Sequence, residues 1–287
     1  FLDYVQGVTA ALRDTDACAG RLRGFDLSIT STVPPGSGLS SSAALEIALL
    51  RALRQAFALP LSDLDLALLG QRAENELVGA RVGIMDQLVC SLGERGAALF
   101  VDARSLATQR VPLPSAVELL VIHSGVSHRL APGGADPAGR DYNTRRGECE
   151  QAAAALYVPQ LRDAADLPDA AARVAALPSP QRQRARHVIA ENARVLAAVA
   201  ALEARDMATL GRLMDASHRS LRDDYDVSTP EVDTLVARAQ ADPAVLGARI
   251  TGGGFGGSIV ALCSPGAAAA AGARISDIYA RDTSQTP

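Results

Sequence analysis

A glycine- and serine-rich stretch, Pro34 to Ala44, sets narrow limits on how this chain can fold. It reads Pro-Pro-Gly-Ser-Gly-Leu-Ser-Ser-Ser-Ala-Ala and separates two segments of different periodicity. Before it, apolar residues occupy alternate positions between residues 25 and 33, which predicts a strand. After it, leucines recur at helical spacing, so a helix is predicted to begin near Ser40. The chain therefore has to pass from a strand into a helix through a glycine turn.

Such a turn is also a candidate anion site. Glycines allow the backbone to approach a ligand closely, and the start of a helix presents unpaired N–H groups and a positive dipole end. The three hydroxyls of Ser40, Ser41 and Ser42 can serve phosphate oxygens or a hard metal ion. A helix terminus contributes ~0.3–2 kcal/mol, whereas millimolar affinity already needs about 4 kcal/mol. We therefore expect a divalent cation to assist a nucleotide here; the alternative is an ordinary helix cap.

The remaining sequence mixes helical and strand patterns without regular alternation, which favours an α+β fold in two domains. Helices are predicted over 61–78, over most of 143–215 with a break at 177–180, and after the Thr229-Pro230 cap; strands are predicted at 97–101, 117–123 and 258–263. The stretch 126–141 is predicted to be a long loop. Two prolines between strands place the predicted boundary so that the domains are 1–113 and 114–287.

Charge and cysteine content exclude several classes of protein. The chain has 28 basic and 32 acidic residues and a formal net charge of -4, which argues against nucleic acid or an anionic membrane as a partner. Every basic residue is an arginine, so Schiff-base chemistry, catalytic lysines and the lysine-bearing P-loop are excluded. The four cysteines are far apart and form no Cys-x-x-Cys pair. This spacing predicts free thiols in a reducing cytoplasm, without a zinc cluster or a disulfide framework.

A second glycine run, Gly252 to Gly257, formally contains the Gly-x-Gly-x-x-Gly pattern. In dinucleotide-binding folds those glycines follow a strand and open a helix. Here they precede an apolar strand pattern, so that interpretation fails on context. A tight turn that approaches a ligand is the preferred interpretation, and a purely structural turn is the alternative.

Two carboxylates require an explanation. Asp86 lies in the apolar context of Gly83-Ile84-Met85-Asp86-Gln87, where it is either a helix cap or a site residue. Glu74, from its local sequence alone, is predicted to be a solvated helix residue. The histidines show no metal-ligand spacing and are predicted to be structural. One further group is predicted to form an exposed, solvated helical face: Arg182, Arg184, Arg186 and His187.

These motifs together resemble the GHMP small-molecule kinases, and within that family the branch that phosphorylates galactose. The resemblance is carried by residues 34–46 as the phosphate loop, 83–87 as an active-site segment and 247–257 as a third family motif, with further galactose-branch likeness at 142–150, 184–189 and 217–225. It implies an N-terminal mixed α/β domain that holds the phosphate loop. It also implies a C-terminal ferredoxin-like domain with extra helices.

The resemblance implies ATP-dependent phosphorylation of galactose at its anomeric hydroxyl, with Mg²⁺. Asp86 matches the catalytic aspartate that accepts or polarises the hydroxyl proton, and Ser42 and Glu74 match the magnesium ligands. The positions implied to line the triphosphate are Gly36, Ser37, Gly38, Leu39, Ser40, Ser41 and Ser42. The positions implied to contact the sugar are Gly83, Asp86 and Tyr225.

The sequence departs from the family at its beginning. The family's upstream signature, Gly-Arg-Val-Asn-x-Ile-Gly-Glu-His-x-Asp-Tyr, has no match here. Because Phe1 falls inside the family pattern, we expect this sequence to be a fragment of a longer, cytoplasmic, monomeric kinase. The alternative is a catalytically silent relative that binds sugar and ATP.

Overall fold

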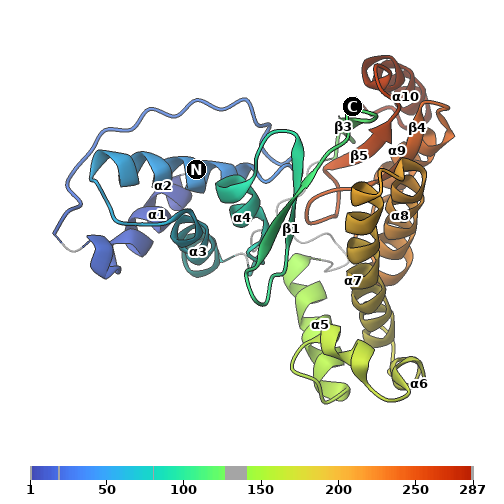
Figure 1. Ribbon diagram of the computed structural model, residues 1–287, viewed down its shortest axis with the longest axis horizontal. Helices are drawn as coiled ribbons and strands as arrows, with labels where there is room; N and C mark the ends of the chain where they lie inside the picture. The colour runs from blue at the N-terminus through green and yellow to red at the C-terminus, as the bar shows by residue number, and fades with distance from the viewer. Residues whose placement is uncertain (1, 19, 80, 127–140, 286–287) are drawn as a thin grey trace. The chain divides into compact units, whose positions relative to one another are not determined.

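The computed structural model describes residues 2–18, 20–79, 81–126 and 141–285. These residues divide into two compact units, 2–112 and 113–285 (Figure 1). Apart from its two end residues, the loop predicted at 126–141 lies outside the described residues.

The first unit is a group of helices followed by a hairpin. Its elements are α1 (Leu2–Arg13), η1 (Asp16–Cys18), α2 (Ser41–Ala56), α3 (Asp63–Ala73), η2 (Glu74–Val78), α4 (Met85–Leu92), β1 (Ala97–Val101) and β2 (Thr108–Pro112). Strands β1 and β2 pair antiparallel. Leu12 of α1, Leu50 of α2 and Leu66 of α3 are fully buried in one cluster. Removing such leucines from water supplies about 1.5–3 kcal/mol each, so this cluster fixes the helices that carry the glycine loop.

Helix α2 begins where the sequence predicts, with Ser40 as its N-cap. The helix predicted at 61–78 is α-helical to Ala73 and then continues as the π-helical turn η2. A capping box opens α3: the Ser62 hydroxyl accepts from the Asp65 amide, and the Asp65 carboxylate accepts from the Ser62 amide. Reciprocal capping satisfies two orphan donors and sets where the helix begins.

The strand predicted at 25–33 is not formed. This segment is extended but pairs with no strand of the described residues. Its alternating apolar side chains Phe25, Leu27 and Ile29 are 38–41% exposed. The sequence alternates as a strand does, but a strand also requires a neighbour that supplies ladder hydrogen bonds. None of the described strands pairs with this segment.

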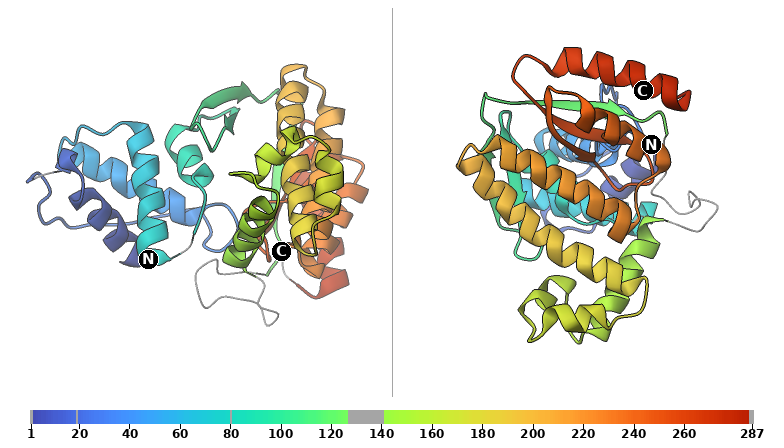
Figure 2. Two further views of the ribbon diagram at one scale, coloured as in Figure 1. Left: turned by 90° about the horizontal axis from the view of Figure 1, so that it is seen from below. Right: turned by 90° about the vertical axis from the view of Figure 1, so that its right-hand side faces the viewer.

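The second unit contains a three-stranded antiparallel sheet with the order β3–β5–β4. Its strands are β3 (Glu118–His123), β4 (Val245–Ile250) and β5 (Ser258–Cys263). In the central strand, Ile259 pairs with Ile122 on one side and Ile250 on the other. Helices α9 (Pro230–Ala241) and α10 (Ala268–Thr283) pack on this sheet (Figure 2) and share its buried core. The buried Tyr279 hydroxyl donates to the carbonyl of Ser124 at 2.6 Å.

The rest of the second unit is helical. Its elements are α5 (Tyr142–Ala155), η3 (Leu161–Asp166), α6 (Ala170–Ala175), α7 (Gln181–Glu203), α8 (Met207–Ser220) and η4 (Leu221–Tyr225). The break predicted near 177–180 falls between α6 and α7. Helix α9 opens as predicted, because the Thr229 hydroxyl accepts from the Val232 amide and Pro230 occupies the first helical position. Proline fits there because that amide has no intrahelical partner.

Helix α8 touches strand β4 backbone to backbone. A Cβ atom on Gly211 would lie 2.1 Å from the carbonyl oxygen of Leu246, and one on Gly247 would lie 2.1 Å from the carbonyl oxygen of Gly211. Neither distance is sterically allowed, so both positions require glycine.

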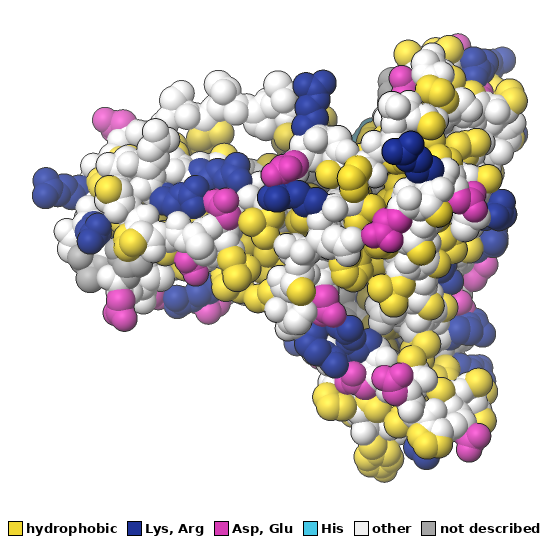
Figure 3. All heavy atoms as spheres, in the orientation of Figure 1, with side chains coloured by type: hydrophobic (Ala, Val, Ile, Leu, Met, Phe, Trp, Pro, Cys, Tyr) yellow, Lys and Arg dark blue, Asp and Glu magenta, His cyan; other side chains and the backbone are white. Residues whose placement is uncertain are grey.

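The described surface is of mixed charge. On the face drawn in Figure 3, arginine and acidic side chains are interspersed over each unit. Within the described ranges, none of the helices has both the length and the apolar content that a membrane span requires. All four cysteines are unpaired, as the sequence predicts, with Cys18 and Cys263 buried.

Candidate active site

The glycine loop of the first unit curls through left-handed backbone conformations. Gly36 and Gly38 have φ of 72° and 73°, and Ser40 has φ of 56°. Glycine adopts this region freely, whereas a residue with a Cβ pays roughly 1–2 kcal/mol. The buried Ser37 hydroxyl donates to the Pro34 carbonyl at 2.8 Å and closes the turn. The strained Ser40 is thus held by a loop built around it.

Ser40 directs its hydroxyl away from the helix that it precedes. It is the N-cap of α2, but its side chain makes no capping bond to the first turn. It hydrogen-bonds instead to the Asp86 carboxylate at the start of α4. The first backbone N–H groups of α2 therefore lack a side-chain cap, which is the arrangement of an anion-binding helix terminus.

A cluster of buried carboxylates lies beside this helix start. Glu46 of α2 is fully buried, Glu74 is 5% exposed, and Asp86 is partly buried. The Ser42 hydroxyl hydrogen-bonds to Glu74. Burial, reinforced by neighbouring acidic groups, raises the pKa of Glu46 to about 8, and burial also raises the pKa of Glu74 and Asp86. Ionised carboxylates this close repel one another, so the cluster favours a proton or a cation.

The side-chain amide of Gln87 links two members of this cluster. Its Nε2 donates to Glu74 Oε2 at 2.8 Å and to Glu46 Oε2 at 3.2 Å. Gln87 itself is fully buried. The sequence motifs 34–46 and 83–87 include Glu46 and Gln87, but neither residue was assigned a role from the sequence. The available signal was an acidic residue inside the apolar stripe of α2, one turn before Leu50.

The cluster can supply only some of the ligands that a magnesium ion needs. Among the described residues, no three His, Cys, Asp or Glu side chains are arranged to enclose a metal ion. Ser42 and Glu74 supply a hydroxyl and a carboxylate in contact with each other, both hard oxygen donors. Mg²⁺ is typically bound by one or two carboxylates, with the remaining ligands from phosphates and water. The residues present therefore fit the ion when a nucleotide completes the shell.

The structure corrects two interpretations of the carboxylates. Glu74 is not a solvated helix residue, because its side chain is buried where α3 passes into the π-helical turn η2. Asp86 is not a helix cap: Ile84 occupies the N-cap of α4, and Asp86 stands in the first turn. π-Helical turns are frequent at functional sites because they redirect side chains.

Tyr225 belongs to the second unit and is held by close packing. It is the last residue of the π-helical turn η4. Its ring stacks on His187 with centroids 4.5 Å apart, and its hydroxyl accepts a weak bond from Cys149 Sγ at 3.9 Å. Burial raises the pKa of Tyr225 and lowers that of His187. Both shifts favour the neutral forms, an un-ionised tyrosine beside an uncharged imidazole.

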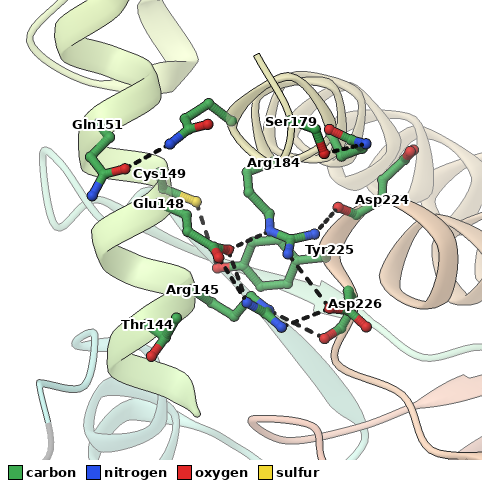
Figure 4. Close-up of polar contacts among 12 residues, drawn as sticks. Thr144, Arg145, Glu148, Cys149, Gln151, Ser179, Arg184, Asp224, Tyr225 and Asp226 are labelled. Atoms are coloured by element: carbon green, nitrogen blue, oxygen red, sulfur yellow. Dashed lines mark hydrogen bonds and ion pairs between the residues drawn. The ribbon is translucent and has the colours of Figure 1, made fainter. Parts of the chain in front are cut away.

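Two buried arginines fix the backbone around Tyr225 (Figure 4). Arg145 of α5 and Arg184 of α7 both bind the Glu148 carboxylate, at 2.9 and 2.6 Å. Arg145 also bonds to the side chain and carbonyl of Asp226, and Arg184 donates to the Asp224 carbonyl. The segment that carries Tyr225 is thus tied to two helices by charge-assisted hydrogen bonds, which are the stronger kind.

This network corrects the exposed face predicted from the arginine-rich segment of α7. Arg184 and His187 are each 5% exposed, and the His187 ring lies 2.9 Å from the Ser220 hydroxyl. Arg186, by contrast, is exposed as expected and pairs with Asp224. The interpretation failed because a buried arginine cannot be told from a solvated one by helical spacing alone.

The second glycine run forms the predicted tight turn. Four of its glycines have positive φ, and the run leads into strand β5, so no helix follows it. The Phe255 amide donates to the Val227 carbonyl at 2.6 Å, and the Gly257 amide donates to the Val126 carbonyl at 2.7 Å. These bonds within the unit hold the turn in place.

The raised pKa of Glu46 predicts a pH-dependent stability. The pKa of Glu46 is about 8 in the folded protein, above its ordinary value of 4.5. The folded state therefore binds a proton on Glu46 more tightly than the unfolded state does, and protonation stabilises the fold. That stabilisation is complete below about pH 4.5 and is lost as the pH rises towards 8. We expect the free energy of unfolding, measured with urea, to fall over this window. Glu46→Gln should flatten the fall, and an unchanged slope in that variant would show that Glu46 is not the group responsible.

Comparison with known proteins places the chain in a family. The model for the GHMP kinases N terminal domain matches residues 3–94, and the model for the GHMP kinases C terminal region matches residues 198–281. The chain belongs to the GHMP kinase family, and the predicted two-domain GHMP fold is confirmed. Its curated relatives then place it with the galactokinases of that family.

Three relatives show how far the likeness extends. The chain is 45% identical to the galactokinase of Mannheimia succiniciproducens over 90% of its length and 66% of that protein, and 43% identical to that of Pasteurella multocida over 98% and 71%. The crystal structure of Lactococcus lactis galactokinase complexed with galactose matches with a TM-score of 0.84 at 29% identity, covering 99% of this chain and 72% of that one. The chain thus spans 66% of the length of the first of these relatives.

Proposed function

We propose that the protein to which this chain belongs phosphorylates galactose at its anomeric hydroxyl, with ATP as donor and Mg²⁺ as the metal. The observation that carries the proposal is the convergence of Ser40, Ser42, Glu74 and Asp86 at the start of α2, within one unit. The names and structures of the relatives agree with it.

In this proposal the residues have separate tasks. The loop from Gly36 to Ser42 holds the triphosphate through backbone N–H groups. Ser42 and Glu74 bind Mg²⁺, which when present neutralises charge on the transferring phosphate. Asp86 accepts the proton of the sugar hydroxyl, and its raised pKa brings it closer to the range in which a general base works well. Gly83 and Tyr225 contact the sugar.

Electrostatic stabilisation and positioning account for most of the catalysis in phosphoryl transfer. The Ser40 hydroxyl positions the proposed base, because its hydrogen bond orients the Asp86 carboxylate beside the phosphate loop. We further propose a monomer in the cytoplasm, a location supported by four unpaired cysteines.

The direct test is a kinase assay on the full-length protein. Galactose, glucose, mevalonate and homoserine are offered separately with Mg·ATP, and the product is identified by ³¹P and ¹³C NMR. Galactose 1-phosphate should form well above the other products. Binding of galactose and ATP without turnover would support the alternative of a catalytically silent binder. Preferred turnover of mevalonate or homoserine would overturn the proposed substrate.

Replacement of Glu74 tests the metal assignment. Glu74→Gln keeps the size of the side chain but removes a charged oxygen ligand. The Mg²⁺ concentration for half-maximal activity should rise by about tenfold or more, the scale on which metal sites respond to altered ligand shells. Glu76→Gln, an exposed neighbour paired with Arg72, is the matched control. An unchanged magnesium titration for Glu74→Gln would remove Glu74 from the metal site.

A further inference from the structure

Gln87 occupies an unusual position among the buried carboxylates of the first unit. Its amide nitrogen Nε2 donates to Glu74 Oε2 at 2.8 Å and to Glu46 Oε2 at 3.2 Å. Both hydrogens of the amide are therefore used on carboxylates. Gln87 is therefore oriented by Glu46 as well as by Glu74.

The same pair of residues carries two unsatisfied atoms. Glu46 Oε1 and Gln87 Oε1 are both buried and have no hydrogen-bond partner among the described residues. Each such acceptor normally costs about 1–3 kcal/mol. A proton on Glu46 Oε1 would satisfy both atoms, because a carboxylic acid and an amide form a cyclic pair in which each group donates once and accepts once.

Helix α3 of the same unit leaves room for Glu46 and Gln87. Gly70 of α3 faces them, and a Cβ atom there would lie 3.2 Å from Gln87 Cγ and 3.4 Å from Glu46 Oε2. These separations are tight for a methyl group, so glycine suits this position. The raised pKa of Glu46 agrees with a neutral acid, although the pairing rests on the contacts alone.

We propose that Glu46, as a neutral acid, pairs with Gln87 and that this acid–amide pair positions the Glu74 carboxylate for a divalent cation. Neither residue touches the substrate or the metal in this arrangement; both are positioning residues. Glu46 fixes the plane of the Gln87 amide, and the second amide hydrogen then holds one oxygen of Glu74. Gln87 makes no bond to the other oxygen of Glu74, Oε1. The inference rests on the proposed role of Glu74.

An acid–amide pair predicts a different result from a role of Glu46 and Gln87 in packing alone. Glu46→Gln preserves a donor and an acceptor, so an amide–amide pair can replace the acid–amide pair. Gln87→Glu has the same shape but loses the amide. A carboxyl group at that position can donate at most one hydrogen bond, whereas the Gln87 amide donates to both Glu74 and Glu46. The first variant should therefore be tolerated and the second should not. Gln87→Met is a neutral second variant in case Gln87→Glu fails to fold.

The experiment uses the full-length protein with Mn²⁺ as the probe and ATP present without sugar, so that no turnover occurs. Free Mn²⁺ is measured by electron paramagnetic resonance. Gln87→Glu and Gln87→Met should weaken Mn²⁺ binding by about tenfold or more, whereas Glu46→Gln should bind as the unmodified protein does. Gln71→Glu is the control, because Gln71 bonds to the Val82 carbonyl at 3.1 Å and to none of the acids.

A metal-free measurement complements this assay. The infrared difference spectrum between unmodified protein and Glu46→Gln should contain the carbonyl band of one buried carboxylic acid. Weakened Mn²⁺ binding in Glu46→Gln, unaltered binding in both Gln87 variants, or absence of the acid band would each overturn the inference. Failure to phosphorylate galactose with these results intact would overturn the proposed function alone.

Discussion

Replacing Asp86 by asparagine should lower the turnover of the full-length kinase by about 10²-fold or more, the usual contribution of a general base. The substitution keeps the size of the side chain and a hydrogen-bonding oxygen for Ser40. The fold should therefore remain intact, while proton acceptance from the sugar hydroxyl is lost. Turnover at saturating galactose and ATP, with circular dichroism as the check on folding, measures the effect.

The matched control for this substitution is Asp277→Asn. Asp277 is an exposed carboxylate on α10 of the second unit. Asp277→Asn should leave turnover unchanged. This control separates a general effect of removing one negative charge from the loss of the base. Near-normal turnover in Asp86→Asn would remove Asp86 from the proton-transfer step.

Replacing Arg145 by methionine should lower the free energy of unfolding by about 3–5 kcal/mol, the range observed when one partner of a buried ion pair is removed. Arg145 is 4% exposed and bonds to both Glu148 and Asp226. Without it, the partly buried Glu148 keeps Arg184 as its guanidinium partner, and the backbone at Asp226 loses an anchor. Urea unfolding monitored by circular dichroism gives the value.

The adjacent residue offers a close control. Arg146 is 42% exposed at its side chain and pairs with Glu150 one helical turn away. Exposed pairs of this kind contribute roughly 0–1 kcal/mol, so Arg146→Met should have a small effect. Equal losses in the two variants would mean that helix α5, and not the buried network, determines the stability of this region.

The sequence predicted elements best where local signals determine them. The Thr229-Pro230 cap specifies the start of α9 through a bond to the Val232 amide, and that bond is present. Helix α2 also begins at the predicted serines, although the Ser40 side chain makes no capping bond there. The alternation at 25–33 specifies only which face of a strand is apolar. Whether a ladder forms depends on a distant partner, so that prediction was wrong.

Residues of the site show the same division. Ser42, Glu74 and Asp86 were assigned to the site from the family resemblance, and the structure brings them together. Glu46 and Gln87 lie at the ends of two of the motifs that carry this resemblance but were given no role, because their mutual contact in the core cannot be predicted from either motif. Arg184 was misjudged for a similar reason: its partner Glu148 lies on another helix, and periodicity contains no information on charge pairing across helices.

The contact between Gly211 and Gly247 has a consequence for how Tyr225 is placed. Helix α8 continues directly into η4. Tyr225 therefore lies fourteen positions after Gly211, where the backbones of α8 and β4 touch with no side chain between them. Side-chain interfaces can adapt to substitution by repacking, whereas this junction has nothing to repack. Substitutions in the surrounding core can therefore change the packing around the tyrosine, while the two glycines keep helix α8 at the same place on strand β4.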